Sequence, residues 1–221
     1  PYCQRPIELG ADFSVQSLTK GISGFGTDMG GSVAGPHQYY GKLMLFRKDF
    51  GGSLNPKSAW IFLVYGLPSL ATRFSNQIKT AHHIAKFLEG HPKIEKVVYP
   101  GLNDFSQFEL AKRQMVNHAG KFSPGNMIYF LLKDAAIDGK QSPKVENFID
   151  YLADHAYCIT LAVSLGYIKT LIENAYSMTH SALPEEEKRK MGMEPGGIRL
   201  SVGLEDWHDI KEDLRDALTH V

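Results

Sequence analysis

The chain has 221 residues, of which 43% are hydrophobic and 22% charged, and its formal net charge is zero. This composition is typical of a globular protein that is long enough to bury a substantial core. It argues against a nucleic-acid partner, which favours a basic surface, and the apolar runs are too short to cross a membrane. Two cysteines, Cys3 and Cys158, form no disulfide framework and have no metal-ligand spacing, so we expect a cytoplasmic protein without a metal site.

The first third of the chain predicts short elements around a glycine-rich loop. We expect a short helix over residues 6–11, a strand over residues 13–16, and further strands over residues 31–35 and 43–46. Asn55 and Pro56 have the pattern of a helix N-cap and first position, and this helix should reach about Val64 before Gly66 ends it.

A long amphipathic helix is predicted next, running to Gly90. Its apolar positions recur at intervals of three and four, which places them on one stripe, with the residues from Arg73 to Lys79 on the solvated side. The stripe comprises Leu67, Leu70, Phe74, Ile78, Ala81, Ala85 and Leu88. A helix of this length is expected to bridge two domains.

The remaining residues predict helices and strands in mixed order, which favours a small α+β domain. We expect strands over residues 94–98, 126–132, 158–163 and 198–202. Helices are expected over residues 107–115, around residues 145–152, over the charged run 184–190, and from Trp207 to the end.

Lys20 is the first candidate for chemistry. It ends the run Ser17-Leu18-Thr19-Lys20 and precedes a loop with many glycines. A lysine amine can form a Schiff base with a carbonyl such as that of pyridoxal phosphate, and hydroxyls and glycine backbone suit a phosphate. Taken alone, this pattern equally fits a surface lysine before a flexible loop.

Several segments in order resemble the Cys/Met-metabolism (trans-sulfuration) family of pyridoxal-phosphate enzymes. They are residues 4–34, Trp60, Gly66-Leu-Pro-Ser-Leu70, residues 91–101, Ser164-Leu-Gly166, Met178-Thr-His180 and residues 197–206. The resemblance implies an α/β and α+β fold, which is the end of an aspartate-aminotransferase-like (fold type I) large domain followed by a small C-terminal α+β domain. The expected boundaries are 1–66 for the large-domain part, 67–90 for the bridging helix and 91–221 for the small domain.

The resemblance also implies roles for five residues. Lys20 would bind pyridoxal 5'-phosphate covalently and move protons, Ser17 and Thr19 would contact its phosphate, and Arg199 and Ser164 would bind the substrate's carboxylate. The residues by themselves leave alternatives open: strand-end capping for the two hydroxyls, a salt bridge to an internal acid for Arg199, and a turn residue for Ser164. Arg199 lies in an apolar strand, where a guanidinium needs a partner. His180 is assigned a structural role.

The implied activity is elimination or replacement at the β or γ carbon of a sulfur-containing or O-acylated amino acid. A methionine or cystathionine γ-lyase is the first interpretation, and an O-acylhomoserine sulfhydrylase or cystathionine γ-synthase is the alternative. Phe25, Tyr65, Tyr167 and Lys169 depart from common family residues, so the reaction stays open among these.

Because the chain starts at Pro1, just where the resemblance places the end of a strand with a cofactor-binding aspartate, we expect the C-terminal portion of a longer enzyme. The full-length protein is expected to be a homo-oligomer, a dimer of dimers. This portion alone should be inactive, and an inactive truncated copy with an assembly role is the non-enzymatic alternative.

Overall fold

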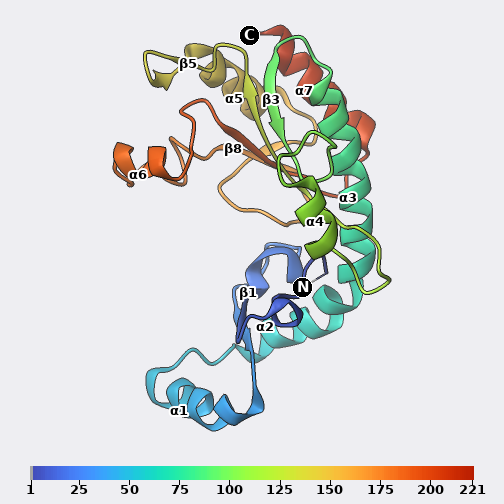
Figure 1. The fold of residues 1–221 in the computed structure, drawn as a ribbon, viewed down its shortest axis with the longest axis vertical. Coiled ribbons are helices and arrows are strands. Elements are labelled where there is room, and N and C mark those ends of the chain that lie inside the picture. The colour runs from blue at the N-terminus through green and yellow to red at the C-terminus, as the bar shows by residue number, and fades with distance from the viewer. Residues whose placement is uncertain (1) are drawn as a thin grey trace.

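The computed structural model describes residues 2–221 in two parts that the long helix α3 connects (Figure 1). Pro1, and the expectation that rests on it, lies outside the described residues. The first part holds β1, β2, α1 and α2, and the second holds a five-stranded sheet with its helices. Helix α3, Leu67–Glu89, contacts the turns of the first part at one end and β3, β4 and α7 at the other.

The first part consists of short elements. Its strands β1 (Ser14–Ser17) and β2 (Gly31–Ala34) lie within one residue of the predicted ranges 13–16 and 31–35, and they pair antiparallel as a separate two-stranded sheet. The other elements are the 3-10 helices η1 (Pro6–Leu9) and η3 (His37–Tyr39), the wide turns η2 (Leu18–Ile22) and η4 (Phe62–Gly66), and the α-helices α1 (Tyr40–Phe50) and α2 (Pro56–Ile61).

The strand predicted over residues 43–46 is wrong, because this segment lies in helix α1. A short apolar run does not by itself distinguish a strand from a helix, and Lys42 and the leucines around it favour a helix. None of the residues of α1 is buried, and Figure 1 shows the helix projecting from the rest of the chain.

Gly66 does not end the helix that begins at Pro56, which corrects a second prediction. The Asn55 side chain accepts a hydrogen bond from the Lys57 backbone N–H, as an N-cap should. Gly66 has helical backbone angles, φ −65° and ψ −60°, and the helical path continues through η4 into α3. A Cβ at Gly66 would lie 2.7 Å from the Ile22 carbonyl oxygen. The glycine therefore permits close contact with η2 rather than a helix end.

The predicted stripe of α3 is correct only in its second half. Ala81, Ala85 and Leu88 are buried, but the first half of the helix buries Arg73 and Gln77 instead of exposing them. Arg73 is 4% exposed and Gln77 is fully buried. The expectation that the face from Arg73 to Lys79 is solvated is therefore wrong for these two residues.

The second part is built on one mixed sheet. Its strands are β3 (Ile94–Val98), β4 (Met127–Leu132), β7 (Thr160–Leu161), β8 (Leu171–Asn174) and β9 (Ile198–Ser201), in the order β3-β4-β9-β8-β7. All neighbours are antiparallel except β7 and β8, which are parallel. Strand β7 is shorter than the predicted strand over residues 158–163. Strand β8 was not predicted, because the polar residues Glu173 and Asn174 interrupt its apolar pattern.

Helices cover one face of this sheet. They are α5 (Pro143–His155), α7 (Trp207–Thr219) and the second half of α3. The elements that lie outside this helical layer are α4 (Phe108–Gln114), α6 (Glu185–Lys190) and the hairpin of β5 (Ala136–Ile137) with β6 (Lys140–Gln141). The core between helices and sheet includes Ile84, Phe130, Phe148, Leu200 and Leu214. These buried positions confirm the amphipathic helices predicted for α5 and α7.

Candidate active site

Lys20 lies in the wide turn η2 directly after strand β1. Its backbone angles, φ −82° and ψ −132°, depart from the helical values of its neighbours, so the chain changes direction at this residue. The glycine loop returns to the same place: the Leu18 N–H donates to the Gly30 carbonyl at 2.9 Å, and the Gly30 N–H donates to the Thr19 hydroxyl at 3.0 Å. Lys20 is therefore presented at the closed base of the loop.

The lysine amine reaches across the molecule to Ser164. Lys20 Nζ donates a hydrogen bond to Ser164 Oγ at 2.8 Å, although the two residues are 144 positions apart. The carbonyl oxygen of Ser164 in turn accepts a hydrogen bond from Arg199 Nη2 at 2.9 Å. Three of the five residues named from the sequence thus form one connected chain of hydrogen bonds.

Two glycines allow the segment of Ser164 to approach Lys20. Gly166 has a positive φ of 74°, and a Cβ there would lie 2.8 Å from the backbone nitrogen of Gly21. The Gly166 N–H also donates to the buried Ser201 hydroxyl at 2.8 Å, which ties the turn to strand β9. Only glycine combines this backbone conformation with so close an approach.

Arg199 is paired with an acid inside the protein. Its Nη1 lies 2.7 Å from Oε1 of Glu173, a fully buried residue on the neighbouring strand β8. The register places Glu173 and Arg199 opposite each other in β8 and β9. Oε1 of Glu173 forms this ion pair without the geometry of a hydrogen bond. Oε2 of the same carboxylate accepts a hydrogen bond from the Thr179 hydroxyl at 2.6 Å.

The salt bridge is the alternative that the sequence left open for Arg199, and it leaves part of the guanidinium accessible. The side chain is 18% exposed and borders a cavity of about 520 Å³, whose other lining residues include Tyr129, His180 and Glu194. Arg199 can therefore be held by Glu173 and still offer donors to a carboxylate. Its role in substrate binding stays a prediction.

The two predicted phosphate contacts differ in their surroundings. The Thr19 hydroxyl is already engaged with Gly30, which is the capping role that the sequence allowed. Ser17 is exposed at the end of β1, and its hydroxyl makes no hydrogen bond within residues 2–221. The donor set of an amine and an exposed hydroxyl beside a glycine loop fits pyridoxal phosphate, with Lys20 and Ser17 as the residues that would hold it.

Two aromatic residues that depart from the family pattern lie at this loop: Phe25 is part of it, and Tyr167 packs against it. The Phe25 ring lies 5.5 Å from the Arg73 guanidinium, and a Cβ at Gly26 would lie 2.9 Å from the Tyr167 ring. The Tyr167 carbonyl accepts a hydrogen bond from Gln77 at 2.7 Å. Both aromatic residues thus line the segment that follows Lys20.

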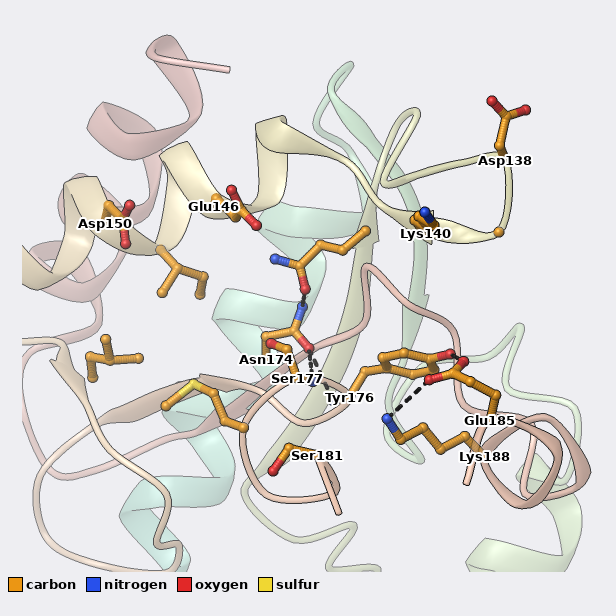
Figure 2. Close-up of a pocket in the computed structure, with 15 residues that line it drawn as sticks. Asp138, Lys140, Glu146, Asp150, Asn174, Tyr176, Ser177, Ser181, Glu185 and Lys188 are labelled. Atoms are coloured by element: carbon orange, nitrogen blue, oxygen red, sulfur yellow. Dashed lines mark hydrogen bonds and ion pairs between the residues drawn. The ribbon is translucent and has the colours of Figure 1, made fainter. Parts of the chain in front are cut away.

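A separate cavity of about 850 Å³ lies between helix α5, the β5–β6 hairpin and helix α6 (Figure 2), and neither Lys20 nor Arg199 is among its lining residues. Asn174 donates to Gln141 Oε1 at 2.7 Å, and Lys188 lies 3.3 Å from Glu185. Glu146 and Asp150 line the wall formed by α5. These polar groups bond to one another or lie apart, so they do not gather around one point.

No group of three or more histidine, cysteine, aspartate or glutamate side chains in residues 2–221 could hold a metal ion. His180 contacts the Ala175 carbonyl through Nδ1 at 3.1 Å, a local contact in the turn after β8. No helix of these residues is long and apolar enough to span a membrane.

Comparison with known proteins decides the family. The profile of the family described as "Cys/Met metabolism PLP-dependent enzyme" matches residues 1–219. The chain belongs to this family. Its members depend on pyridoxal phosphate, and the match confirms the resemblance, the fold type and the cofactor inferred from the sequence.

Named relatives include both lyases and a synthase. The chain is 39% identical to an L-methionine gamma-lyase of Porphyromonas gingivalis and 37% identical to a cystathionine gamma-lyase of Dictyostelium discoideum, in each case over 99% of its length. It superposes with a TM-score of 0.87 and 32% identity on a cystathionine gamma-synthase from Xanthomonas oryzae pv. oryzae, covering 100% of this chain and 53% of that one.

The chain spans about half the length of the curated relatives that it matches, 51% and 52% for the two lyases. The domain boundaries and the individual site residues remain predictions. Sequence reasoning missed Glu173 and Arg73. Glu173 follows the apolar Leu171 and Ile172, which is the signal that had identified Arg199, whereas Arg73 lies in a mostly polar run that gives no such signal.

Proposed function

We propose that the protein containing these residues is a pyridoxal-phosphate-dependent lyase that eliminates a thiol from methionine or cystathionine. The observation that carries the proposal is the contact of Lys20 Nζ with Ser164 Oγ at 2.8 Å, with Arg199 bonded to the carbonyl of the same serine. This arrangement provides an amine next to donors that suit an amino-acid carboxylate.

Each residue has a separate task in this proposal. Bound pyridoxal phosphate supplies an electron-withdrawing ring that stabilises negative charge at the substrate's α carbon. Lys20 holds the proton at its Nζ and moves it to and from the substrate, while Ser164 orients that amine by accepting its hydrogen bond. Arg199, held by Glu173 at 2.7 Å, binds the substrate's carboxylate and thereby fixes the position of the α carbon.

The relatives support this choice and a close alternative. L-Methionine gamma-lyases and cystathionine gamma-lyases of several organisms match at 33% to 39% identity, and the solved structures include a cystathionine gamma-synthase with cystathionine and a cystathionine gamma-lyase with L-serine. A cystathionine γ-synthase is therefore the second candidate, together with the O-acylhomoserine sulfhydrylase that the sequence leaves open.

Further parts of the proposal concern assembly. Of the 22 large hydrophobic side chains that are exposed within the described residues, 18 lie in residues 7–67 and four lie beyond. Such an apolar surface favours association. We propose that it packs against a preceding segment of a longer cytoplasmic protein and in a homo-oligomer, and that these residues alone are inactive.

The test is to express the longest natural form of the protein and to supply methionine, cystathionine, or an O-acylhomoserine with sulfide. We expect methanethiol or cysteine together with a 2-oxo acid from the first two substrates. Lys20→Ala should abolish turnover and the visible absorbance of bound cofactor, and Arg199→Lys should raise KM because it loses the two-point fork. Arg113→Lys, at an exposed position of α4, is the matched control.

Turnover only with the O-acylhomoserine and sulfide would favour the alternative reaction. A Lys20→Ala variant with the same absorbance and rate as the original would refute the assignment of the lysine. Activity of residues 1–221 on their own would refute the need for a preceding segment.

A further inference from the structure

Arg73 makes a set of hydrogen bonds that converge on the backbone directly after Lys20. Its Nη1 donates to the Gly21 carbonyl at 3.0 Å, and its Nη2 donates to the Ile22 carbonyl at 2.9 Å. The same Nη2 donates to the Gly66 carbonyl at 2.9 Å, and Nε donates to the Ser69 hydroxyl at 2.9 Å. One guanidinium thus joins η2, which carries Lys20, to η4 and the first turn of α3.

This cation is buried without an acidic partner among the described residues. Arg73 is 4% exposed, and none of the ion pairs within residues 2–221 includes it. Burial lowers the pKa of Arg73 below its ordinary value, which reflects the cost of removing the charge from water. Such a residue is retained at a cost in stability, which the three backbone carbonyls, the Ser69 hydroxyl and the Phe25 ring offset in part.

The surrounding backbone is shaped to hold the guanidinium. Gly24 has a positive φ of 77°, and a Cβ there would collide with Arg73 Nη1. Gly66 lets the carbonyl of Ile22 approach α3, and a Cβ at Gly21 would lie 2.6 Å from the Phe74 ring. The turn after Lys20 therefore packs against Arg73 and Phe74 on successive positions of the same helix.

We propose that Arg73 is a positioning residue for Lys20, which fixes the carbonyls of Gly21 and Ile22 and thereby holds the lysine amine against Ser164. The inference rests on the proposed role of Lys20. It follows from the geometry: Lys20 has backbone angles unlike those of its helical neighbours, and its turn is bonded to Arg73 at the two residues that follow. A lysine in place of Arg73 could reach one carbonyl but lacks the planar fork that holds both.

The experiment measures the reactivity of Lys20 itself. The longest natural form of the protein, freed of cofactor, is labelled with pyridoxal phosphate and borohydride, which joins the cofactor to a reactive lysine through a C–N bond. Peptide mapping gives the labelling rates of Lys20 and Lys112 from pH 6 to 10. The variants are Arg73→Lys and Arg73→Met, with Arg113→Lys as the exposed control on α4.

We expect Arg73→Met to slow labelling by on the order of 100-fold at neutral pH, since a displacement of about 1 Å has effects of that size. The loss should be specific to Lys20, because an exposed lysine such as Lys112 on α4 does not depend on this turn. Arg73→Lys should recover part of the rate. If the labelling of Lys20 relative to Lys112 is the same in Arg73→Met as in the original protein, the proposal is overturned.

Gly24→Ala gives a second test that keeps Arg73 and covers the case in which Arg73→Met does not fold. Its methyl group would press on the guanidinium, so it should also lower the labelling of Lys20 relative to Lys112, and this effect should be smaller when Arg73→Lys is also present. Equal effects in both backgrounds would contradict the coupling. If Lys20 is not labelled in the unsubstituted protein, the proposed function fails, whereas identical relative labelling in all variants refutes only the role of Arg73.

Discussion

The ion pair between Glu173 and Arg199 predicts a measurable coupling within the sheet. Glu173 is fully buried and lies 2.7 Å from a guanidinium that is 18% exposed. Glu173→Gln removes the negative charge but keeps the size and the acceptor for Thr179, and Arg199→Met removes the positive charge. Each single variant leaves one charge without its partner inside the protein.

The expected magnitude follows from this burial. Removing one partner of a buried pair typically costs about 3–5 kcal/mol, and we expect the lower end, about 3 kcal/mol, because water reaches part of Arg199. The double variant leaves no unpaired charge, so its cost should be below the sum of the two single costs by about 2 kcal/mol.

The assay is urea unfolding of the four proteins, with the slope of the transition compared to confirm that the denatured states match. The control is a second cycle on Lys96 and Glu194, which lie 2.9 Å apart but are 52% and 42% exposed. That pair should show a coupling below about 1 kcal/mol. If the coupling of Glu173 with Arg199 is below about 0.5 kcal/mol, the two residues act independently and the reasoning is wrong.

Two predictions concern helix α7. Asp206 caps the N-terminus of α7, and its hydrogen bond from the His208 backbone N–H lowers the pKa of the carboxyl below the ordinary 3.8. The stability that this charge contributes should therefore be full at neutral pH and should be lost as the pH falls through the lowered pKa. Urea midpoints of the original protein and Asp206→Asn should therefore converge in acid, and a constant difference would contradict the prediction. The Asp213 carboxylate accepts hydrogen bonds from the backbone N–H groups of residues 157–159 and from the thiol of Cys158. Burial raises the pKa of this thiol most, and the carboxylate raises it further. Asp213→Asn should cost about 1–3 kcal/mol and speed alkylation of Cys158 at pH 8, and an unchanged alkylation rate would count against the contact.

The first part of the chain shows how far a local sequence pattern predicts structure. The strands β1 and β2 and the cap at Asn55 were predicted from residues close in sequence, whereas the antiparallel pairing of the two strands was not. Helix α1 was read as a strand, and Gly66 as a helix end. In both cases the residue pattern was compatible with two local structures: helix propensity decides for the exposed helix α1, and the close approach of η2 decides for Gly66.

The sequence alone determined the family, the cofactor, and the helices α5 and α7, because amphipathic periods and matched motifs depend only on local order. It also identified Lys20, Ser164 and Arg199 as separate candidates. Only the tertiary structure joined them, since the contact of Lys20 with Ser164 spans 144 positions. Burial of Arg73 and Glu173 was likewise decided by distant partners, because a charged side chain enters a protein interior only where carbonyls or an opposite charge from other segments replace its water.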